Sequence, residues 1–176
     1  LAVKNYLNYQ KTMVVTNLST SMMLESIANE IIRTRIGEAH VVQKMNELNI
    51  PIGGEGNGGV ILEEVHLGRD SLVAISMILS LLSSSGKSIS DEISNIPQYI
   101  MIKDKIRVDD KIDFDSLETI FDCNEINKID GIKFIWLNKW IHIRKSNTEP
   151  IIRIFAEAKT QEEVDELINT LKNYLK

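Results

Sequence analysis

The sequence contains very little cysteine and no long apolar run. Cys123 is the single cysteine among 176 residues, so the chain forms no intrachain disulfide and no cysteine-cluster metal site. The longest apolar run, Leu72–Leu82, is interrupted by serines and is shorter than the roughly 20 residues that span a bilayer. We therefore expect a cytoplasmic protein without a membrane span.

Positive charge is also scarce. Lys and Arg number 20 against 25 Asp and Glu, which gives a formal net charge of −5. Because a nucleic-acid backbone is bound mainly by clustered cations, this balance argues against general nucleic-acid binding. The chain begins at Leu1 rather than at methionine and shows no signal-peptide pattern, so we expect it to be a piece of a longer protein.

The first half of the chain alternates strand and helix patterns. The β-branched run Thr12–Thr16 predicts a strand, and apolar residues at helical spacing predict a helix within Leu18–Glu30. The other elements expected here are a helix through Val41, Met45 and Leu48, a strand at Val60–Leu62, and a helix over Leu72–Leu82 capped by Asp70. This order predicts an α/β three-layer domain over residues 1–90.

The second half changes to alternating apolar and polar residues. Residues 91–96 lie in a polar stretch and are interpreted as a linker between two domains. The expected strands are Tyr99–Val108, Gly131–Leu137, Trp140–Arg144 and Ile151–Ala158, and the expected helices are Ser116–Phe121 and Glu162–Leu175. We predict an α+β domain over residues 97–176, with an antiparallel sheet covered on one face.

A glycine-rich loop follows residue 52. Its Gly54-Glu-Gly56-Asn-Gly58-Gly59 stretch matches the G-x-G-x-x-G pattern of dinucleotide-binding folds, but a strand pattern follows it where those folds have a helix. One alternative is a flexible turn, because glycine permits positive φ. The other is a sugar site, in which Gly54 and Gly56 bring the backbone close to a ligand while Glu55 and Asn57 bind its hydroxyls.

Together with two further motifs, this loop resembles the α-D-phosphohexomutase family, which includes phosphoglucomutase, phosphomannomutase and phosphoglucosamine mutase. The resemblance rests on Gly53-Gly-Glu-Gly-Asn-Gly-Gly59, His66-x-Gly68-Arg69-Asp70, and Arg144-Lys-Ser-Asn-Thr-Glu-Pro150-x-x-Arg153 with Asp130-Gly131 upstream. The G-E-G-N-G-G form is similar to archaeal members. These motifs cover nearly the whole chain but resemble only the third and fourth of the family's four domains.

The resemblance implies a reaction that interconverts hexose 1-phosphate and hexose 6-phosphate through a bisphosphorylated sugar. It also implies that the phosphoserine loop and the D-x-D-x-D-R magnesium loop belong to N-terminal domains that this sequence lacks. Mg²⁺ and a hexose bisphosphate activator are then cofactors of the parent enzyme, and no catalytic or metal-binding residue is expected in this chain. Asp109, Asp110, Asp113 and Asp115 lack the spacing of that magnesium loop and are interpreted as a solvated acidic turn.

The segment between the last two predicted strands is a candidate phosphate site. If these strands form a hairpin, Arg144 and Arg153 share the face opposite the aliphatic side chains, and a bound anion would relieve their repulsion. Ser146, Asn147 and Thr148 supply hydroxyl, amide and backbone donors. An ordinary hairpin connection is the alternative from composition alone. The resemblance implies that this loop binds the substrate phosphate that is not being transferred.

Two further residues are weaker candidates for contact with the substrate. His66 either touches the sugar or forms a local hydrogen bond, and Arg35 either faces a sugar or phosphate oxygen or is a solvated surface charge. The hexose phosphate and the missing N-terminal domains are the expected partners, with no nucleic acid and no membrane. A non-catalytic phosphosugar-binding module is the alternative function.

Overall fold

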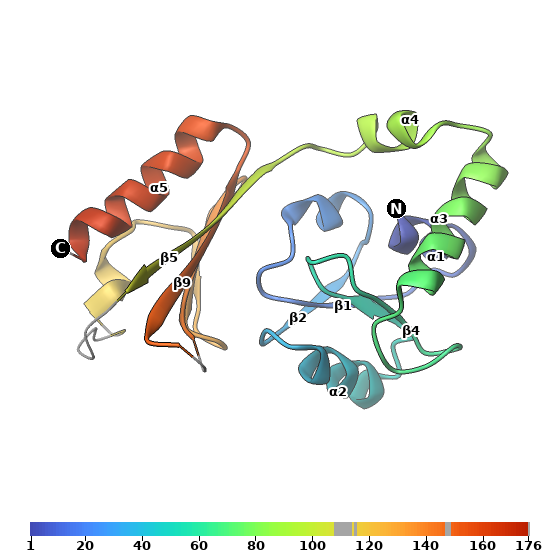
Figure 1. Ribbon diagram of the computed structural model, residues 1–176, viewed down its shortest axis with the longest axis horizontal. Helices are drawn as coiled ribbons and strands as arrows, with labels where there is room; N and C mark the ends of the chain where they lie inside the picture. Colours follow the sequence, from blue (N-terminus) through green and yellow to red (C-terminus); the bar gives the residue numbers. More distant parts are fainter. Residues whose placement is uncertain (108–113, 115, 147–148, 176) are drawn as a thin grey trace. The chain divides into compact units, whose positions relative to one another are not determined.

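The chain consists of two compact units, each built around its own β-sheet (Figure 1). The structure is a computed structural model that describes residues 1–107, 114, 116–146 and 149–175. Unit 1 comprises Leu1–Pro97 and unit 2 comprises Gln98–Lys176. Residues 91–96, interpreted above as a linker, include the second half of a short helix, α4 (Ile89–Ser94), which belongs to unit 1.

Unit 1 contains a four-stranded mixed sheet with the strand order β2-β1-β3-β4. β1 pairs in parallel with both β2 and β3, and β3 pairs with β4 in an antiparallel hairpin. The strands are β1 (Val14–Asn17), β2 (Ile31–Thr34), β3 (Ile52–Gly54) and β4 (Val60–Leu62), and the other elements are α1 (Ala2–Tyr9), the 3₁₀ helix η1 (Met22–Ser26), α2 (Glu38–Leu48) and α3 (Ser71–Ser85).

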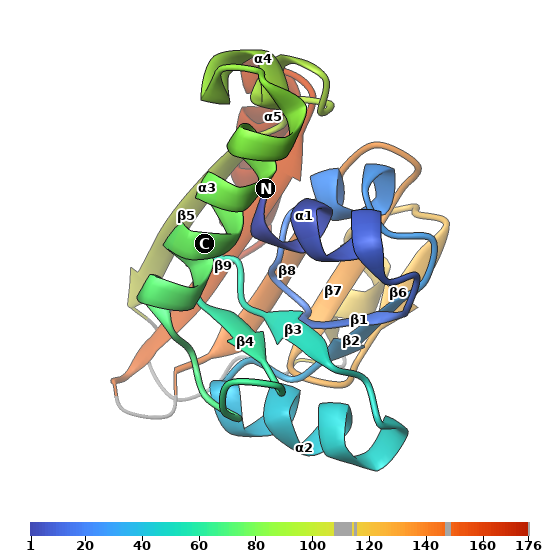
Figure 2. The ribbon, with the colours of Figure 1, turned by 90° about the vertical axis from the view of Figure 1, so that its right-hand side faces the viewer.

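Helices cover both faces of this sheet, as the three-layer prediction requires (Figure 2). Successive strand residues point to opposite faces, so Val14 packs in the cluster with α1 and α3, whereas Val15 packs with Val41 and Met45 of α2. Asp70 caps α3 as predicted, because its Oδ1 accepts the backbone N–H groups of Leu72 (2.7 Å) and Val73 (3.1 Å).

The helix predicted within Leu18–Glu30 was wrong. Only η1 forms there, with its N-cap at Ser21, and the chain then enters β2 directly. A crossover between parallel strands needs about a dozen residues, and this connection provides barely more, so most of it is used for the return to the start of β2. Leu24 and Ala28 are still buried. The apolar pattern therefore predicted correctly that these residues pack in the core, but it predicted a longer helix than the structure contains.

Unit 2 contains a five-stranded antiparallel sheet with the order β5-β9-β8-β7-β6. Its elements are β5 (Ile100–Arg107), the 3₁₀ helix η2 (Ser116–Thr119), β6 (Glu125–Asn127), β7 (Ile132–Ile135), β8 (Trp140–Lys145), β9 (Ile151–Ala158) and α5 (Gln161–Tyr174). The α+β prediction is thereby confirmed, although β6 was not predicted and the expected helix at 116–121 is only one 3₁₀ turn. Among the described residues, no helix is both long and apolar enough to cross a membrane.

One face of this sheet is aliphatic and packs under α5. The cluster contains Ile141, Ile143, Ile152 and Ile154 from the two central strands, all at most 1% exposed. α5 presents the predicted stripe of Val164, Leu167, Ile168 and Leu171, and a capping box between Thr160 and Glu163 fixes where the helix begins. The polar side chains of the central strands therefore lie on the opposite face.

Replacing Leu171 with alanine tests whether α5 holds unit 2 together. The side chain is fully buried, so Leu171→Ala is expected to lower the free energy of unfolding by about 2–5 kcal/mol. Urea unfolding followed by tryptophan fluorescence isolates this unit, because both tryptophans, Trp136 and Trp140, lie in it. Glu166→Ala on the exposed side of α5 is the control, with a change below roughly 0.5 kcal/mol. Equal midpoints for the two variants would contradict the packing described.

Candidate functional site

The carboxyl ends of three parallel strands meet at one edge of the sheet in unit 1. β1 ends at Asn17, β2 at Thr34 and β3 at Gly54, and the registers of both parallel pairs place these residues near one another. The chain leaves β1 toward β2 on one side, and α2 then returns it to β3 on the other side. Ligands of α/β sheets bind at such switch points. The predicted sugar loop begins at this edge.

Glu55 lies at this edge and is held by the chain's own donors. Its side chain is only 6% exposed. Oε1 accepts hydrogen bonds from Asn17 Nδ2 (2.9 Å) and from the backbone N–H of Gly37 (3.2 Å), and Oε2 lies 3.2 Å from Arg69 Nη1. A carboxylate offers about four lone-pair sites. Binding two adjacent hydroxyls at once therefore requires Glu55 to exchange at least one of these partners.

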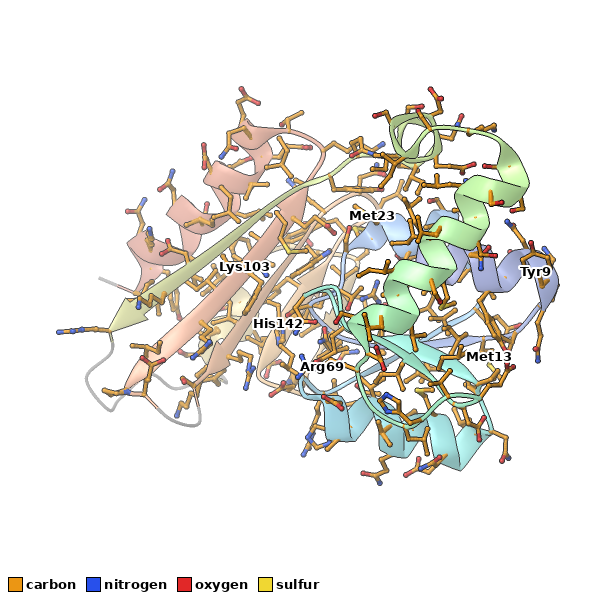
Figure 3. The ribbon with its side chains drawn as sticks, turned by 45° about the vertical axis from the view of Figure 1, so that its right-hand side comes forward. Tyr9, Met13, Met23, Arg69, Lys103 and His142 are labelled. Atoms are coloured by element: carbon orange, nitrogen blue, oxygen red, sulfur yellow. The ribbon has the colours of Figure 1, made fainter. Side chains whose placement is uncertain are left out.

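Arg69, which is labelled in Figure 3, joins Glu55 to Glu38 at the start of α2. Its Nε donates to Glu38 Oε2 (2.7 Å), and its backbone N–H donates to Glu38 Oε1 (3.1 Å). These bonds lower the pKa of Glu38, and the hydrogen bond to Glu38 together with the charge of Glu55 raises the pKa of Arg69. The guanidinium therefore places a permanent positive charge beside the Glu55 carboxylate.

The glycines of the loop allow close approach within the chain itself. A Cβ on Gly54 would lie 2.4 Å from the carbonyl oxygen of Gly59, and one on Gly59 would lie 2.2 Å from Cδ of Arg69. A Cβ on Gly56 would lie 3.1 Å from Cα of Thr20. Because the loop joins β3 to β4 in a hairpin, no helix begins at it, and the dinucleotide interpretation fails as the sequence context indicated.

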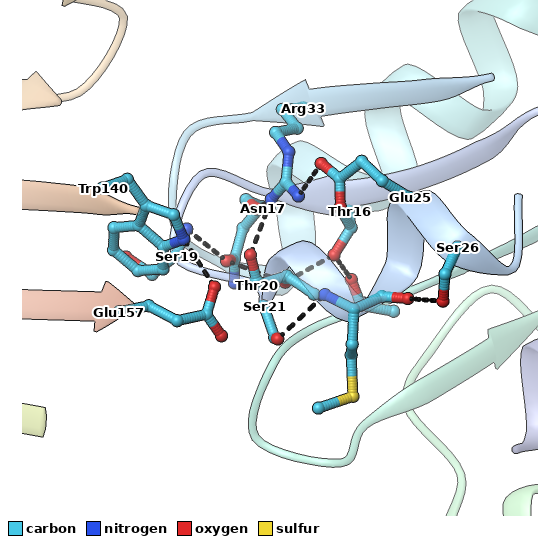
Figure 4. Close-up of polar contacts among 12 residues, drawn as sticks. Thr16, Asn17, Ser19, Thr20, Ser21, Glu25, Ser26, Arg33, Trp140 and Glu157 are labelled. Carbon is cyan, nitrogen blue, oxygen red and sulfur yellow. Dashed lines mark hydrogen bonds and ion pairs between the residues drawn. The ribbon is translucent and has the colours of Figure 1, made fainter. Parts of the chain in front are cut away.

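A cluster of polar residues surrounds the end of β1 and was not identified from the sequence (Figure 4). Asn17 Oδ1 accepts the backbone N–H of Ser19 (3.0 Å) and the hydroxyl of Thr20 (3.2 Å). Arg33 Nη1 donates to the carbonyl oxygens of Asn17 (3.2 Å) and Thr20 (2.8 Å), and its Nη2 donates to Glu25 (2.7 Å). These bonds orient the Asn17 amide toward Glu55. In the sequence, Asn17 directly follows the predicted strand Thr12–Thr16. This position was the one signal that could have indicated that Asn17 holds Glu55.

The remaining sugar-site candidates are less enclosed. His66 is half-exposed, and its Nε2 lies 3.0 Å from Oδ2 of Asp70, a contact that, with the helix-cap bonds, lowers the pKa of the Asp70 carboxyl. Asn57 Oδ1 accepts the backbone N–H of Gly59 (3.1 Å). Arg35 is exposed and follows the last residue of β2. His66 therefore has the local hydrogen bond that was its alternative role, and Arg35 lies at the strand edge where a ligand contact was predicted.

In unit 2, Arg144 and Arg153 lie directly opposite each other on neighbouring strands, as the hairpin prediction required. Arg144 is 13% exposed, with its Nε 3.7 Å from Asp130 Oδ2, and this buried Nε makes no hydrogen bond among the described residues. Arg153 pairs with Glu149 at 2.9 Å. The backbone N–H of Ser146 donates to Ile151 and closes the hairpin.

Some predicted residues of this unit lie outside the described residues. They are Asn147 and Thr148 of the candidate phosphate loop, and Asp109, Asp110, Asp113 and Asp115 of the acidic stretch.

The Asp130-Gly131 turn packs against the strand that carries Arg144. Gly131 has φ +71°, and a Cβ there would lie 2.2 Å from the carbonyl oxygen of Ile143. His142 Nε2 lies 2.5 Å from the carbonyl oxygen of Asp130. Burial, together with the nearby charge of Lys133, lowers the pKa of His142 to about 4. The turn thus holds Asp130 beside the guanidinium of Arg144.

The polar face of the central strands also carries a buried aromatic side chain. Trp140 Nε1 donates to Glu157 Oε2 at 2.7 Å (Figure 4), and the ammonium of Lys133 lies 4.0 Å from the centre of the Trp140 ring. The buried indole N–H thus has a hydrogen-bond partner, and the ring has a cation at its face. The sequence had assigned Trp140 only to a core or a sheet face.

No group of three or more His, Cys, Asp or Glu side chains that could hold a metal ion converges among the described residues. Glu55, an enclosed carboxylate of unit 1, is bonded to an arginine and to two N–H donors.

Two successive family profiles match the chain. One, described as phosphoglucomutase/phosphomannomutase, alpha/beta/alpha domain III, covers residues 1–99. The other, described as the C-terminal domain of phosphoglucomutase/phosphomannomutase, covers residues 105–173. The two units thus correspond to the third and the C-terminal domains of a multidomain family. The chain belongs to the phosphoglucomutase/phosphomannomutase family.

Archaeal relatives are similar over most of this chain. A phosphoglucomutase/phosphomannomutase of Thermococcus kodakarensis is 37% identical over 89% of the chain, and a phosphoglucosamine mutase of Methanococcus maripaludis is 31% identical over 89%. The matched regions are 36% and 37% of those proteins, so the chain spans little more than a third of their length. The predicted similarity to archaeal members and to the third and fourth domains of the family is confirmed.

Solved structures show the same fold. A phosphoglucomutase/phosphomannomutase family protein from Burkholderia thailandensis has a TM-score of 0.79 at 17% identity and covers 97% of this chain and 39% of its own. An Aspergillus fumigatus N-acetylphosphoglucosamine mutase, solved with GlcNAc-6P and magnesium, has a TM-score of 0.64 at 15% identity and covers 98% of this chain and 44% of its own.

The buried His142 predicts a pH dependence of stability. Its pKa is about 4 in the folded chain and about 6.5 when exposed, so between these values the unfolded state binds a proton that the folded state does not. The free energy of unfolding should therefore fall as pH falls through this window. His142→Gln should reduce the loss between pH 7 and pH 5 by roughly 2 kcal/mol.

Urea unfolding at the two pH values, followed by tryptophan fluorescence, measures this loss. His40→Gln, at an exposed position of α2 in unit 1, is the control and should leave the loss unchanged. A pH dependence that is identical in His142→Gln and in the unsubstituted chain would refute the assignment of this histidine.

Proposed function

We propose that this chain is the C-terminal part of a phosphohexomutase that interconverts hexose 1-phosphate and hexose 6-phosphate through a bisphosphorylated sugar. Within that enzyme it recognises the sugar hydroxyls and the phosphate that is not being transferred. The observation that carries the proposal is the direct pairing of Arg144 with Arg153 at the end of the β8–β9 hairpin that contains Ser146. Membership in the family supports it.

The two arginines form a preorganised anion site. Like charges directly opposite each other on a sheet repel, and the two nearby carboxylates, Asp130 and Glu149, compensate only in part because Asp130 lies 3.7 Å from Arg144. A phosphate dianion relieves this repulsion and accepts paired N–H donors from a planar guanidinium. Arg144, Ser146, Asn147 and Thr148 bind it, with Arg153 in a supporting position.

The strand edge in unit 1 recognises the sugar. Glu55 keeps about one lone-pair site for a hydroxyl while Asn17, the Gly37 amide and Arg69 hold it, and it gains a second when Arg69 turns away. Gly54, Gly56 and Asn57 form the loop beside it. Arg35 and His66, at the rim of the same edge, contact the more distant oxygens of the substrate.

The phosphoryl transfer itself requires groups from the N-terminal domains. In the parent enzyme that we propose, a phosphoserine and Mg²⁺ of the N-terminal domains would supply the phosphoryl group and balance its charge, and a hexose bisphosphate activator would load the serine. The A. fumigatus relative was solved in complex with GlcNAc-6P and magnesium. This chain binds and orients the substrate. Orientation lowers the barrier of the phosphoryl transfer only when the groups that react are present in the same protein. We also propose a cytoplasmic location, supported by the single cysteine.

The chain by itself should have no mutase activity. Purified 176-residue protein is incubated with glucose, mannose or glucosamine phosphates, Mg²⁺ and a hexose bisphosphate, and isomerisation is followed by ³¹P NMR. No turnover above the buffer rate is expected. A positive control is a full-length archaeal relative in the same assay. Turnover by the pure chain would show that this chain contains the catalytic groups.

The phosphate loop should bind an anion in the isolated chain, because its residues come from one contiguous segment. Inorganic phosphate added to ¹⁵N-labelled protein is expected to shift the amide signals of residues 144–149, with weak affinity because only one small charged group is bound. Arg144→Ala should abolish the shifts, and Arg153→Ala should weaken them less. Shifts confined to Gly54 and its neighbours would contradict this assignment of the two loops.

A neutral hexose serves as the complementary probe in this titration. It should leave both loops nearly unperturbed, since hydroxyl groups gain little over their bonds with water. The alternative function is a non-catalytic phosphosugar-binding module. It predicts that a hexose phosphate binds this chain much more tightly than inorganic phosphate does.

A further inference from the structure

A row of three cations crosses the polar face of the sheet in unit 2. The β-sheet register pairs Arg153 of β9 with Arg144 of β8 on one side and with Lys105 of β5 on the other. The phosphate site proposed above uses only the two arginines. Lys105 comes from a strand about 40 residues earlier in the sequence, and no motif identified it.

The three side chains share a face because the aliphatic face is already occupied. Ile106, Ile152 and Ile143 are the next residues along these strands on the other side of the sheet, and they pack in the cluster under α5. Side chains alternate between faces along each strand, so Lys105, Arg153 and Arg144 point to the opposite side together. The row of three cations thus follows from the burial of the neighbouring isoleucines under α5.

Few carboxylates compensate this row. Glu149 pairs with Arg153, and Asp130 lies near Arg144. Asp104, the neighbour of Lys105, points to the other face and pairs with Lys172 of α5 at 2.6 Å. Among the described residues, no carboxylate forms an ion pair with the Lys105 side chain.

A hollow adjoins the row on the β5 side. It measures about 380 Å³, and its lining includes Lys105 and Arg153, with Phe155 and Ile151 as apolar surface. Lys103 also lines it and lies with its ammonium 5.8 Å from the centre of the Phe155 ring (Figure 3). Asp104 and Glu149 line the hollow as well, and Glu149 is paired with Arg153. The space beside Arg153 is therefore bordered by two lysines and two acidic residues, and an anion bound there competes with Glu149 for the guanidinium.

We propose that Lys105 is a third phosphate-contacting residue, so that the phosphate site extends from the β8–β9 loop across Arg153 to the edge strand β5. This inference rests on the proposed function, because it concerns the same phosphate. The lysine ammonium is a point charge on a flexible side chain, and it adds to the planar guanidinium groups of the two arginines. It contacts the phosphate from the β5 side of Arg153.

The competing explanation is that Lys105 only protects an exposed sheet edge. β5 is an edge strand, and lysines on edge strands discourage pairing with other chains. That role requires no specific anion and predicts no loss of phosphate affinity when the lysine is replaced. The two explanations therefore differ in a measurable quantity.

The test titrates inorganic phosphate into the ¹⁵N-labelled chain and compares dissociation constants. Lys105→Gln is expected to raise the dissociation constant roughly fivefold, as the loss of one nearby charge does, and Lys105→Arg should restore most of the affinity. Lys159→Gln is the matched control. It removes the same charge about 20 Å from Arg153 along β9 and should change the constant by less than about 1.5-fold.

The outcomes separate this inference from the proposed function. Equal constants for Lys105→Gln and Lys159→Gln, with Arg144→Ala still abolishing binding, overturn the role of Lys105 and leave the loop site intact. Phosphate binding that survives Arg144→Ala overturns the loop site itself. Unchanged tryptophan fluorescence in all variants confirms that unit 2 remains folded. In the unsubstituted chain, phosphate should also shift the ¹⁵Nζ signal of Lys105, and an unmoved signal counts against the contact.

Discussion

The repulsion between Arg144 and Arg153 follows from the way the hairpin β8–β9 buries its aliphatic side chains. Ile143 and Ile152 pack under α5, and the residues next to them are then forced to the opposite face at the same level of the sheet. Burying those isoleucines contributes stability that a surface repulsion between two arginines does not outweigh. The direct pairing of the two arginines is thus fixed by hydrophobic packing on the other side of the strands.

In unit 1, hydrogen bonds fix the position of the Glu55 carboxylate. Glu55 is held by Asn17, by the Gly37 amide and by Arg69, each from a different connection of the sheet. A carboxylate that is buried needs such partners, because desolvating an unpaired charge is costly. The same partners occupy about three of its lone-pair sites, so a sugar hydroxyl of the kind proposed above would compete with Arg69 for the carboxylate. This competition distinguishes Glu55 from a solvated carboxylate that would be available on all sides.

The glycine-rich loop illustrates why a sequence pattern needs its structural context. Gly59 leaves space for the stem of Arg69, and Gly54 allows the hairpin to close. Either glycine would look like a ligand contact if only the spacing of the motif were considered. In the structure, their immediate neighbours are other parts of the chain, and the polar residues Glu55 and Asn57 between them remain the groups that can face a ligand.

The sequence alone determined the features that depend on neighbouring residues. The cap at Asp70, the stripe of α5 and the shared face of Arg144 and Arg153 follow from local spacing, and the motif blocks were sufficient to indicate the family. Only the tertiary structure decided which distant residues meet. Arg69 reaches Glu38 across 31 positions and Asn17 reaches Glu55 across 38, and Lys105 joins the arginines through the pairing of an edge strand. The length of the helix after β1 was likewise decided by the crossover to β2, because the chain had to return to the start of the sheet within the residues available.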